Sequence, residues 1–564
     1  MVQIVQRSVD QAASAALAEA GIRPALARLL AARGVREVSQ LDVSLARLIP
    51  PERLTNNTHM ASLLADAIAT GKNIMVVGDY DADGATATAV AVKGLRSMGG
   101  RVEFLVPNRF EYGYGLTPEI VMLAARQQPD IILTVDNGIA SVDGVNAARE
   151  LGIQVLVTDH HLPGDVTPQA ACIVNPNQHG CDFPSKSLAG VGVMFYVLLA
   201  LRAELRRRGA FASQVEPNLT ELLDLVALGT VADLVRLDDN NRILVEQGLR
   251  RIRAGKCSPG IRALFAVAGR DITKAGPQDL GFSIGPRLNA AGRLDDMTLG
   301  IACLLEQDDV PAGAMAQQLH ELNQERRNIE ADMQDGALDI LDKVDAAGRY
   351  SLSLYQADWH QGVIGILASR IKERFHRPVI AFAPSVDGEI KGSGRSVPGL
   401  HLRDALDVLS KREPGLLLKF GGHAMAAGLS IREQDFEKFS EVFESVVSSL
   451  LAPEQLDAVI EVDGSLAIEE ATLETAHALE RQVWGAGFPP PLFWDEFRIV
   501  QQRIVGERHL KLSLQKEGQV FDAIFFRQEA FLPDTVQVVY QLQVNEYRGN
   551  QSVQLCLQHW QAPV

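Results

Sequence analysis

Acidic and histidine side chains follow short apolar runs at four places in the first half of the chain. The four groups are Asp79-Tyr80-Asp81-Ala82-Asp83-Gly84, Asp136-Asn137-Gly138, Asp159-His160-His161, and Asp233 after Val231-Ala232. A helix N-terminus stabilises one or two carboxylates, but three crowded carboxylates require cations. Carboxylate oxygens with one or two imidazoles suit Mn²⁺ or Mg²⁺ better than Zn²⁺. The pattern therefore predicts a divalent-cation site.

Each group also has an ordinary interpretation when it is taken alone. The aspartate run can be a solvated turn, Asp136 can cap a helix, and His160-His161 can be a loop pair. An EF-hand is excluded because Val90 stands where a bidentate Glu is needed. A P-loop is excluded because no Gly-Lys-Ser/Thr follows at the required spacing. Four such groups together favour two cations about 3.5–4 Å apart, an arrangement that can clamp a phosphoryl group during in-line displacement.

A mainly parallel β-sheet is predicted to position these side chains. The apolar runs at 74–77, 102–106, 131–135, 155–157 and 172–174 alternate with Ala-rich helical stretches. This alternation is typical of βαβ units. Ligands bind such sheets at the carboxyl ends of the strands, where we place all four groups.

The rest of the chain divides into regions of different pattern. Residues 185–345 are predicted to be largely helical, ending in one long helix over 312–344 that bridges two domains. Alternating runs after 455 predict a small β-barrel. The expected domains are an N-terminal helical segment (1–50), a catalytic domain (51–240), a helical region with the long helix (241–345), a second α/β domain (346–452) and a barrel (453–564).

Composition restricts the class of protein. A chain of 564 residues is too long for one core. Its formal net charge of −16 argues against a broad basic face that coats duplex nucleic acid, although a local basic groove remains compatible. Five scattered cysteines favour free thiols in a reducing cytoplasm. We find no run of 18 apolar residues and no secretory signal, so no membrane association is expected.

Basic and aromatic residues in Gly-rich segments are candidates for contact with a phosphate backbone. We expect the arginines to lie in loops, where guanidinium groups can bind phosphate oxygens in bidentate fashion. Ser393, between two glycines, is expected to help Arg109 and Arg395 hold a terminal 5′ phosphate. Each residue could instead serve packing or loop stability. The substrate-binding candidates are Arg109, Tyr112, Arg287, Asn289, Arg293, Ser393, Arg395 and His423.

The motifs together resemble the RecJ exonucleases of the DHH phosphoesterase superfamily. The resemblance rests on Asp159-His160-His161 with the other acidic groups, and on the segments 107–116, 188–193, 284–293 and 421–428. It implies an α/β fold with a parallel-sheet DHH domain, a DHHA1-type domain after a long helix, and an OB-like nucleic-acid-binding barrel. It also implies a metal-dependent 5′-to-3′ exonuclease that is specific for single-stranded DNA, releases 5′ mononucleotides, and acts in recombination and repair.

The resemblance further implies roles for individual residues. His161 would face the scissile phosphate, and Asp159 would orient a neighbouring imidazole. Many relatives have a His four residues before the first metal-binding aspartate, where this chain has Val77. Either Asp79 substitutes for that ligand or one metal site is weaker. The implied ligands of two Mn²⁺ or Mg²⁺ ions are Asp81, Asp83, Asp136, His160 and Asp233, with Asp79 as the additional candidate.

Two other functions remain open at this point. A DHH phosphodiesterase for short oligonucleotides or cyclic dinucleotides would be shorter and lack the barrel. A non-catalytic DNA-binding scaffold would have lost several metal carboxylates. The family implies single-stranded DNA with a 5′ end, a single-strand-binding protein and a helicase as partners, and we expect a monomer.

Overall fold

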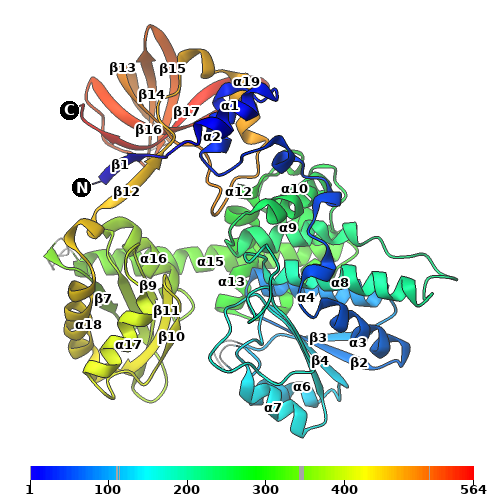
Figure 1. The fold of residues 1–564 in the computed structure, drawn as a ribbon. Helices are drawn as coiled ribbons and strands as arrows, with labels where there is room; N and C mark the ends of the chain where they lie inside the picture. Colours follow the sequence, from blue (N-terminus) through cyan, green and yellow to red (C-terminus); the bar gives the residue numbers. More distant parts are fainter. Residues whose placement is uncertain (1, 109–111, 113–114, 342–347, 507, 564) are drawn as a thin grey trace. The chain divides into compact units, whose positions relative to one another are not determined.

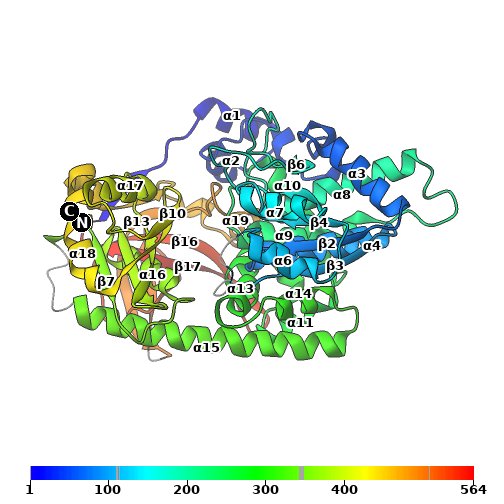
Figure 2. The ribbon, with the colours of Figure 1, turned by 90° about the horizontal axis from the view of Figure 1, so that it is seen from below.

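The computed structural model describes every residue except 1, 109–111, 113–114, 342–347, 507 and 564. The chain forms two compact units (Figure 1). The larger unit contains residues 6–320 and 461–564, and the smaller contains residues 1–5 and 321–460. The division falls within the long helix α15 (Asp309–Leu341), which Figure 2 shows as one uninterrupted helix. The predicted long helix is therefore present and begins three residues earlier than expected, and its predicted end at 344 lies outside the described residues.

A five-stranded parallel sheet forms the centre of the larger unit's α/β part. All neighbouring strands run parallel, in the order β3-β2-β4-β5-β6. Their bounds are β2 (Asn73–Gly78), β3 (Arg101–Leu105), β4 (Ile131–Val135), β5 (Gln154–Thr158) and β6 (Cys172–Val174). The prediction of a mainly parallel sheet is confirmed. Both faces are covered, which explains the largely apolar sequences of the inner strands β2, β4 and β5, whereas the edge strand β3 exposes Arg101 and Glu103.

Helices cover the two faces of this sheet. Side chains of alternate strand residues, such as Met75 and Ile132, pack against Ile120 of α6 (Pro118–Ala125) and Val145 of α7 (Val142–Glu150). Helices α4 (Ala82–Ser97), α8 (Gly190–Arg207) and α9 (Leu223–Ala232) pack against one another, and α4 and α8 also contact the strands. Helix α3 (Asn57–Ala69) packs on α8.

The predicted helical region is present between the sheet and α15. After α9 it contains α10 (Asp239–Arg253), α11 (Pro259–Val267), a short α12 (Pro277–Asp279), a π-helical segment (Leu280–Ile284), α13 (Gly285–Leu294) and α14 (Thr298–Leu305). The N-terminal segment holds α1 (Gln11–Glu19) and α2 (Pro24–Ala31). Contrary to the all-helical expectation for this segment, Val2–Gln6 is strand β1, because it pairs with β12 (Ala458–Val462) far along the chain.

The smaller unit contains a mixed five-stranded sheet in the order β10-β11-β9-β8-β7. Its strands are β7 (Leu352–Tyr355), β8 (Val379–Pro384), β9 (Glu389–Arg395), β10 (Lys419–Gly422) and β11 (Ala426–Arg432). Its main helices are α16 (Ile364–Phe375), α17 (Leu402–Arg412) and α18 (Phe436–Leu450). Residues 439, 443, 446 and 447 of α18 pack with the sheet in one apolar cluster.

The expected Gly-rich loop around Ser393 is wrong, because Gly392 to Arg395 belong to strand β9. A Cβ added at Gly392 would lie 2.6 Å from the Phe382 ring, and one added at Gly394 would lie 2.7 Å from Leu402 Cδ2. The glycines therefore make room for core side chains on a buried strand face. They do not form a backbone cradle for an anion.

The C-terminal strands close into a barrel in the order β13-β14-β15-β17-β16, which confirms the prediction. The strands are β13 (Phe493–Val505), β14 (His509–Lys516), β15 (Gln519–Phe526), β16 (Thr535–Tyr547) and β17 (Asn550–Gln561). Strands β15 and β17 pair in parallel, and the other pairs are antiparallel. Helix α19 (Leu473–Glu480) packs on β16 and β17.

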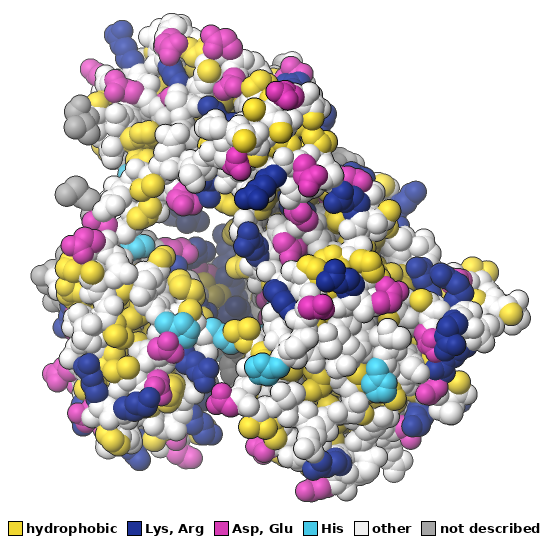
Figure 3. All heavy atoms as spheres, in the orientation of Figure 1, with side chains coloured by type: hydrophobic (Ala, Val, Ile, Leu, Met, Phe, Trp, Pro, Cys, Tyr) yellow, Lys and Arg dark blue, Asp and Glu magenta, His cyan; other side chains and the backbone are white. Residues whose placement is uncertain are grey.

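The surface carries charges of both signs. On the face drawn in Figure 3, basic and acidic side chains are interspersed among the described residues, and neither sign forms a single broad field. This distribution agrees with the expectation from the net charge. Among the helices that the structure describes, none is long and apolar enough to span a membrane.

Candidate metal centre

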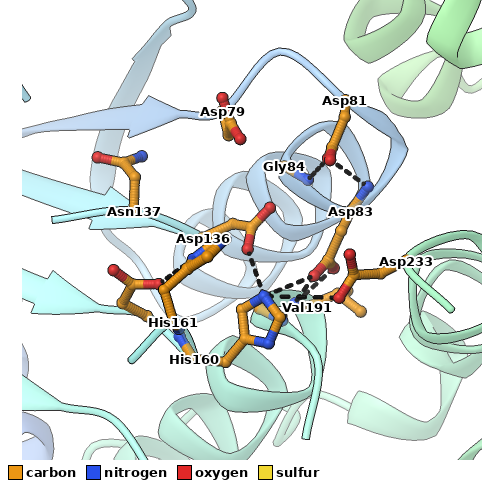
Figure 4. A network of polar contacts seen from close by, with 12 residues as sticks. Asp79, Asp81, Asp83, Gly84, Asp136, Asn137, His160, His161, Val191 and Asp233 are labelled. Carbon is orange, nitrogen blue, oxygen red and sulfur yellow. Dashed lines mark hydrogen bonds and ion pairs between the residues drawn. The ribbon is translucent and has the colours of Figure 1, made fainter. Parts of the chain in front are cut away.

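The four chemically suited groups meet at one edge of the parallel sheet (Figure 4). Asp79 and Asp81 lie in the turn between β2 and α4, and Asp83 lies in the first turn of α4. Asp136 directly follows β4, and His160 comes two residues after β5. Asp233 departs from the prediction because Val231 and Ala232 are the last residues of helix α9, so Asp233 caps a helix and does not follow a strand.

Backbone amides hold the aspartates of the first group. Asp81 is the N-cap of α4, and its Oδ1 accepts hydrogen bonds from the backbone N–H groups of Asp83 (2.9 Å) and Gly84 (3.0 Å). Asp83 is fully buried, and its two oxygens accept from Gly190 N (2.7 Å) and Val191 N (2.9 Å) at the start of α8. The positive end of that helix thus stabilises a buried carboxylate.

His160 faces three carboxylates from three different elements. Its Nε2 lies 3.1 Å from Asp136 Oδ1, 3.5 Å from Asp233 Oδ2 and 3.8 Å from Asp83 Oδ2. Burial, followed by the charge of His161, lowers the pKa of His160 to about 4. The imidazole is therefore neutral at physiological pH, and a neutral imidazole nitrogen is a metal ligand.

Burial and mutual repulsion disfavour the ionised forms of the carboxyl groups around His160. Burial, followed by the charge of Asp81, raises the pKa of Asp83 to about 7. Burial also raises the pKa values of Asp136 and Asp233 well above their usual range, and Asp83 is the largest neighbouring cause for both. Like charges brought together away from water repel unless a cation compensates them. The electrostatics therefore fit bound divalent cations.

Gly190 lets Asp136 approach the start of α8, a role that was not predicted from the sequence. A Cβ added at Gly190 would lie 2.5 Å from Asp136 Oδ1 and 2.7 Å from Asp136 Cγ. Asp136 itself has a φ of 61°, a left-handed conformation that costs energy in a non-glycine residue. A small residue at a helix start was the only signal available in the sequence, and many glycines share it.

We expect Gly190→Ala to lower kcat by about 10²-fold. The added methyl group displaces Asp136 and weakens the two hydrogen bonds that backbone N–H groups donate to Asp83. A misplacement of about 1 Å can have an effect of this size. Initial rates on a single-stranded substrate with saturating metal would measure it. The control is Gly209→Ala, where an added Cβ has nothing within 4 Å. Because Gly209 has a φ of 75°, this control tests backbone strain without crowding. Equal activity of the two variants would contradict the steric argument.

Asp159 and His161 form a separate pair beside the cluster. Asp159 Oδ1 lies 2.8 Å from His161 Nδ1 and accepts from the backbone N–H groups of His160 and His161, while Oδ2 accepts from Ile139 N. Burial would raise the pKa of Asp159, but the hydrogen bond and charge of His161 outweigh it and lower that pKa. Burial would likewise lower the pKa of His161, but Asp159 raises it to about 9. With both oxygens occupied, Asp159 is placed to orient His161.

Among the residues that the structure describes, three groups of side chains have ligand atoms within 4.8 Å of one another and could each hold a metal ion. The groups are Asp79-Asp81-Asp136, Asp83-His160-Asp233 and Asp136-His160-His161. Asp136 belongs to two of these groups, and His160 also belongs to two. Shared residues of this kind suit two ions that would be held close together. Val77, at the position of the absent histidine, is 1% exposed and packs in the apolar cluster with Met75. Asp79 is the nearby carboxylate on that side, so the residues present fit the ions without a histidine at position 77.

The arginines of the segment 284–293 lie in a helix and not in a loop, contrary to prediction. Arg287 and Arg293 belong to α13, and Arg287 donates to Ser283 O and contacts His320 Nδ1 at 3.0 Å. Asn289 of the same helix accepts a hydrogen bond from Ala82 N (2.8 Å) through Oδ1. A Cβ added at Gly292 would collide with Tyr80 O. Helix α13 therefore supports the turn that carries the aspartates.

Two of the candidates in the smaller unit, Ser393 and Arg395, lie together at the start of α16. Arg395 Nη1 donates to Ser393 Oγ (3.2 Å) and to Gly394 O (2.8 Å). A Cβ added at Gly365 would lie 2.9 Å from Arg395 Nη2 and 3.0 Å from Ser393 Oγ, so both side chains lie against the first turn of α16. Arg395 is thus on a strand, not in a loop. His423 stands between β10 and β11, and its backbone N–H donates to Ala426 O.

Of the two candidates in the segment 107–116, the structure describes Tyr112. Tyr112 is partly buried and packs against the cluster that covers the sheet face of α6 and α7. Arg109 lies outside the described residues.

Three family models match the chain. The DHH family N-terminal domain matches residues 73–230, the DHHA1 domain matches 348–449, and the RecJ OB domain matches 462–559. The candidate metal ligands from Asp79 to His160 fall within the first match. Asp233 lies just after it.

Similar proteins cover nearly the whole chain. The chain is 55% identical over 548 residues to a single-stranded-DNA-specific exonuclease RecJ of Dickeya dadantii, with 95% of each chain covered. It is 52% identical to the protein of that name in Escherichia coli, with 99% of this chain and 98% of the relative covered. The crystal structure of RecJ with Mn²⁺ from Thermus thermophilus matches with a TM-score of 0.83 at 31% identity, covering 100% of this chain and 80% of that chain. The chain belongs to the RecJ family of single-stranded-DNA-specific exonucleases.

Proposed function

We propose that the protein is a metal-dependent exonuclease that degrades single-stranded DNA from the 5′ end and releases 5′ mononucleotides in recombination and repair. The observation that carries the proposal is the position of His160 Nε2 among two buried carboxylates, Asp83 and Asp136, and the partly buried Asp233, 3.1–3.8 Å away. Those carboxyl groups have raised pKa values, and the relatives that share the chain's full length are exonucleases. Such a site suits phosphodiester hydrolysis.

Mn²⁺ or Mg²⁺ is the proposed cofactor, as two ions. Structures of the Thermus thermophilus relative are described with each of these metals. Asp79, Asp81, Asp83, Asp136, His160 and Asp233 would hold the ions. When bound, the ions supply an activated hydroxide and compensate charge on the phosphate.

His161 and Asp159 are proposed to act on the phosphate together. The protonated imidazole of His161 donates to a phosphate oxygen and stabilises the charge that develops there. Asp159 keeps that imidazole protonated and fixes its orientation through Nδ1. We assign the second nitrogen, Nε2, to the contact with the substrate.

The end specificity is proposed to come from recognition of a 5′ phosphate. Arg395 and Ser393 lie together at the first turn of α16, where the backbone dipoles favour an anion. We assign this group, together with Arg109, to the terminal phosphate. Arg287, Asn289, Arg293, Tyr112 and His423 are proposed as further contacts to the strand. A single-strand-binding protein and a helicase are the proposed partners of a cytoplasmic monomer.

Degradation of end-labelled oligonucleotides tests the function and its polarity. A single strand labelled at the 5′ end should lose its label immediately as a mononucleotide in Mn²⁺ or Mg²⁺, while a 3′-labelled strand should shorten progressively. A blunt duplex should resist, and EDTA should stop the reaction. Release of the 3′ label first would contradict the polarity, and degradation restricted to the shortest oligonucleotides would favour a small-substrate phosphodiesterase.

Metal should also stabilise the fold. We expect saturating Mn²⁺ to raise the free energy of unfolding of the larger unit by about 3 kcal/mol at 100-fold excess over the dissociation constant. In the metal-free protein, the carboxyl groups of Asp83, Asp136 and Asp233 have folded-state pKa values above their unfolded values. Their contribution to the free energy of unfolding is therefore fully present below the pKa that they have in the unfolded chain. It is lost as the pH rises through the pKa that they have in the folded protein.

Thermal melting in EDTA and in Mn²⁺, between pH 5 and pH 8, measures this effect. The metal-free melting temperature should fall as the pH rises through about 7, the pKa of Asp83. The increase caused by Mn²⁺ should grow over the same interval, because deprotonated ligands bind metal. An increase by Mn²⁺ that is the same at pH 5 and pH 8 would contradict the assignment of these carboxylates as ligands.

A further inference from the structure

Phe282 is a large apolar side chain that the fold leaves exposed. It is 78% exposed, whereas its neighbours Leu280, Ser283 and Ile284 are buried. It belongs to the π-helical segment Leu280–Ile284. π-Helical turns are rare and frequently occur at functional sites, and exposed aromatic residues are common in surfaces that bind other molecules. The fold therefore directs Phe282 outward without packing it.

The segment that carries Phe282 contacts the residues next to the metal centre. A Cβ added at Gly281 would lie 3.3 Å from Val231 Cγ1, and one added at Gly285 would lie 3.1 Å from Ala232 Cβ. Val231 and Ala232 directly precede Asp233. The segment that carries Phe282 is thus packed, on both sides of Phe282 in the sequence, against the two residues that precede a candidate ligand.

Arginines hold the backbone around Phe282. Arg270 Nε donates to Ser283 Oγ (3.2 Å) and lies 3.6 Å from Asp279 Oδ1. Arg287 donates to Ser283 O. Both arginines thus contact the residue next to Phe282. Exposed aromatic rings together with cations on the same surface are how proteins bind unpaired nucleic acid, because bases stack on the ring and the cations attract the backbone.

Leu234 provides a second exposed apolar side chain on the other side of Asp233. It is 68% exposed and has a φ of 60°. A left-handed conformation in a leucine costs energy, and such strain is concentrated at functional sites. The turn after α9 therefore directs an apolar side chain into solvent directly after a candidate metal ligand.

We infer that Phe282 and Leu234 form a contact strip for the bases of the single strand next to the scissile phosphate. Phe282 stacks on one base, and Leu234 packs against the edge of a neighbouring nucleotide. Such contacts are tolerant of sequence because every base has an apolar face. They require unpaired bases, so they favour single strands over duplex. The inference rests on the proposed function, since it assigns the occupant as the substrate strand.

Binding to matched strands with and without bases tests this strip. In the full-length protein carrying Asp136→Ala to prevent cleavage, the dissociation constant for a 5′-phosphorylated oligo-dT is measured by fluorescence anisotropy. Phe282→Ala should raise that constant by about five-fold or more, and Leu234→Ala should raise it by a smaller factor. Phe282→Trp should bind as tightly as the parent. Leu151→Ala is the control, because Leu151 is 47% exposed at the end of α7, away from the site.

A strand of the same length with abasic sites at its first positions separates stacking from other causes. On that strand Phe282→Ala should bind like the parent, because the stacking partner is absent. Equal weakening on both strands, or no weakening on either, would overturn the inference. Melting temperatures of the variants establish that they are folded. Degradation of the same oligo-dT by the unaltered protein is measured separately, so absence of that activity refutes the proposed function without deciding the role of Phe282.

Discussion

Asp136→Asn is expected to lower kcat by at least about 10³-fold, equivalent to roughly 4 kcal/mol in the activation free energy. Asp136 takes part in two of the three groups that could hold a metal ion. Its Oδ1 is also the carboxylate oxygen nearest to His160 Nε2, at 3.1 Å. An amide has nearly the same shape but no charge, so it weakens the cation sites while leaving the surrounding packing in place.

The same substitution is expected to stabilise the metal-free protein. Burial and four neighbouring aspartates raise the pKa of Asp136 well above its usual range, so its ionised form costs stability at neutral pH. The neutral amide removes this repulsion, and a gain of about 1–2 kcal/mol is typical when a functional site is relieved in this way. If the variant loses activity and its metal-free form becomes more stable, the charge of Asp136 is needed to bind cations and not to stabilise the fold.

Two measurements on Asp136→Asn check these results together. Initial rates with saturating metal give kcat, and melting in EDTA and in Mn²⁺ gives stability. Asp143→Asn is the matched control, since Asp143 is an exposed aspartate in the first turn of α7 and should leave both quantities nearly unchanged. A metal-free melting temperature below that of the parent protein would show that Asp136 has a structural role instead.

The parallel sheet and the position of most candidate ligands were predictable because they depend on local patterns. Strands β2, β4 and β5 are short apolar runs, and a carboxylate or histidine follows each of them within one or two residues. Once the strands are parallel, their carboxyl ends must meet at one edge. Asp136 and His160 are therefore placed together by topology alone, although the 3.1 Å separation of their atoms is a result of tertiary structure.

The predictions for Asp233, Arg287 and Arg293 were wrong because the same residue pattern occurs in two different structures. Val231-Ala232 ends a helix, because a short apolar run does not distinguish a strand from a buried helix. The glycines at 285 and 292 suggested loops around Arg287 and Arg293, but they permit close packing of α13 on Ala232 and Tyr80. Glycine indicates either a turn or a close approach, and only the partner across the contact decides between them.

The exposed position of Phe282 could not be predicted from the sequence. A phenylalanine between apolar residues in a helical pattern is ordinarily a core residue. Its exposure follows from the π-helical turn at 280–284 and from the contacts of Gly281 and Gly285 with α9, which orient the segment. These contacts are separated by about fifty residues in the sequence, and no local pattern records them.

Asp159→Asn is expected to lower kcat by about 10²-fold at pH 8 and to move the alkaline limb of the pH profile to lower pH. Asp159 raises the pKa of His161 to about 9, against the effect of burial. His161 is then protonated below that pKa and loses its proton as the pH rises through it. Without the carboxylate, burial dominates and the pKa falls, so less of the donor is protonated at pH 8. Bound cations lower the same pKa in both proteins, so the parent's limb lies at or below pH 9.

The profile of kcat between pH 6 and pH 10 in Mg²⁺ separates this positioning role from a structural one. Asp159→Asn also weakens hydrogen bonds from Ile139 N and His160 N, so some loss of stability is expected. Loss of folded protein lowers kcat equally at all pH values and does not move the limb. His161→Gln, which has no titrating group, should lack the alkaline limb and should be insensitive to a second substitution at Asp159. If the limb stays at the same pH in Asp159→Asn, the catalytic proton does not belong to His161, because a hydrogen bond of 2.8 Å to a buried carboxylate cannot be removed without changing its pKa.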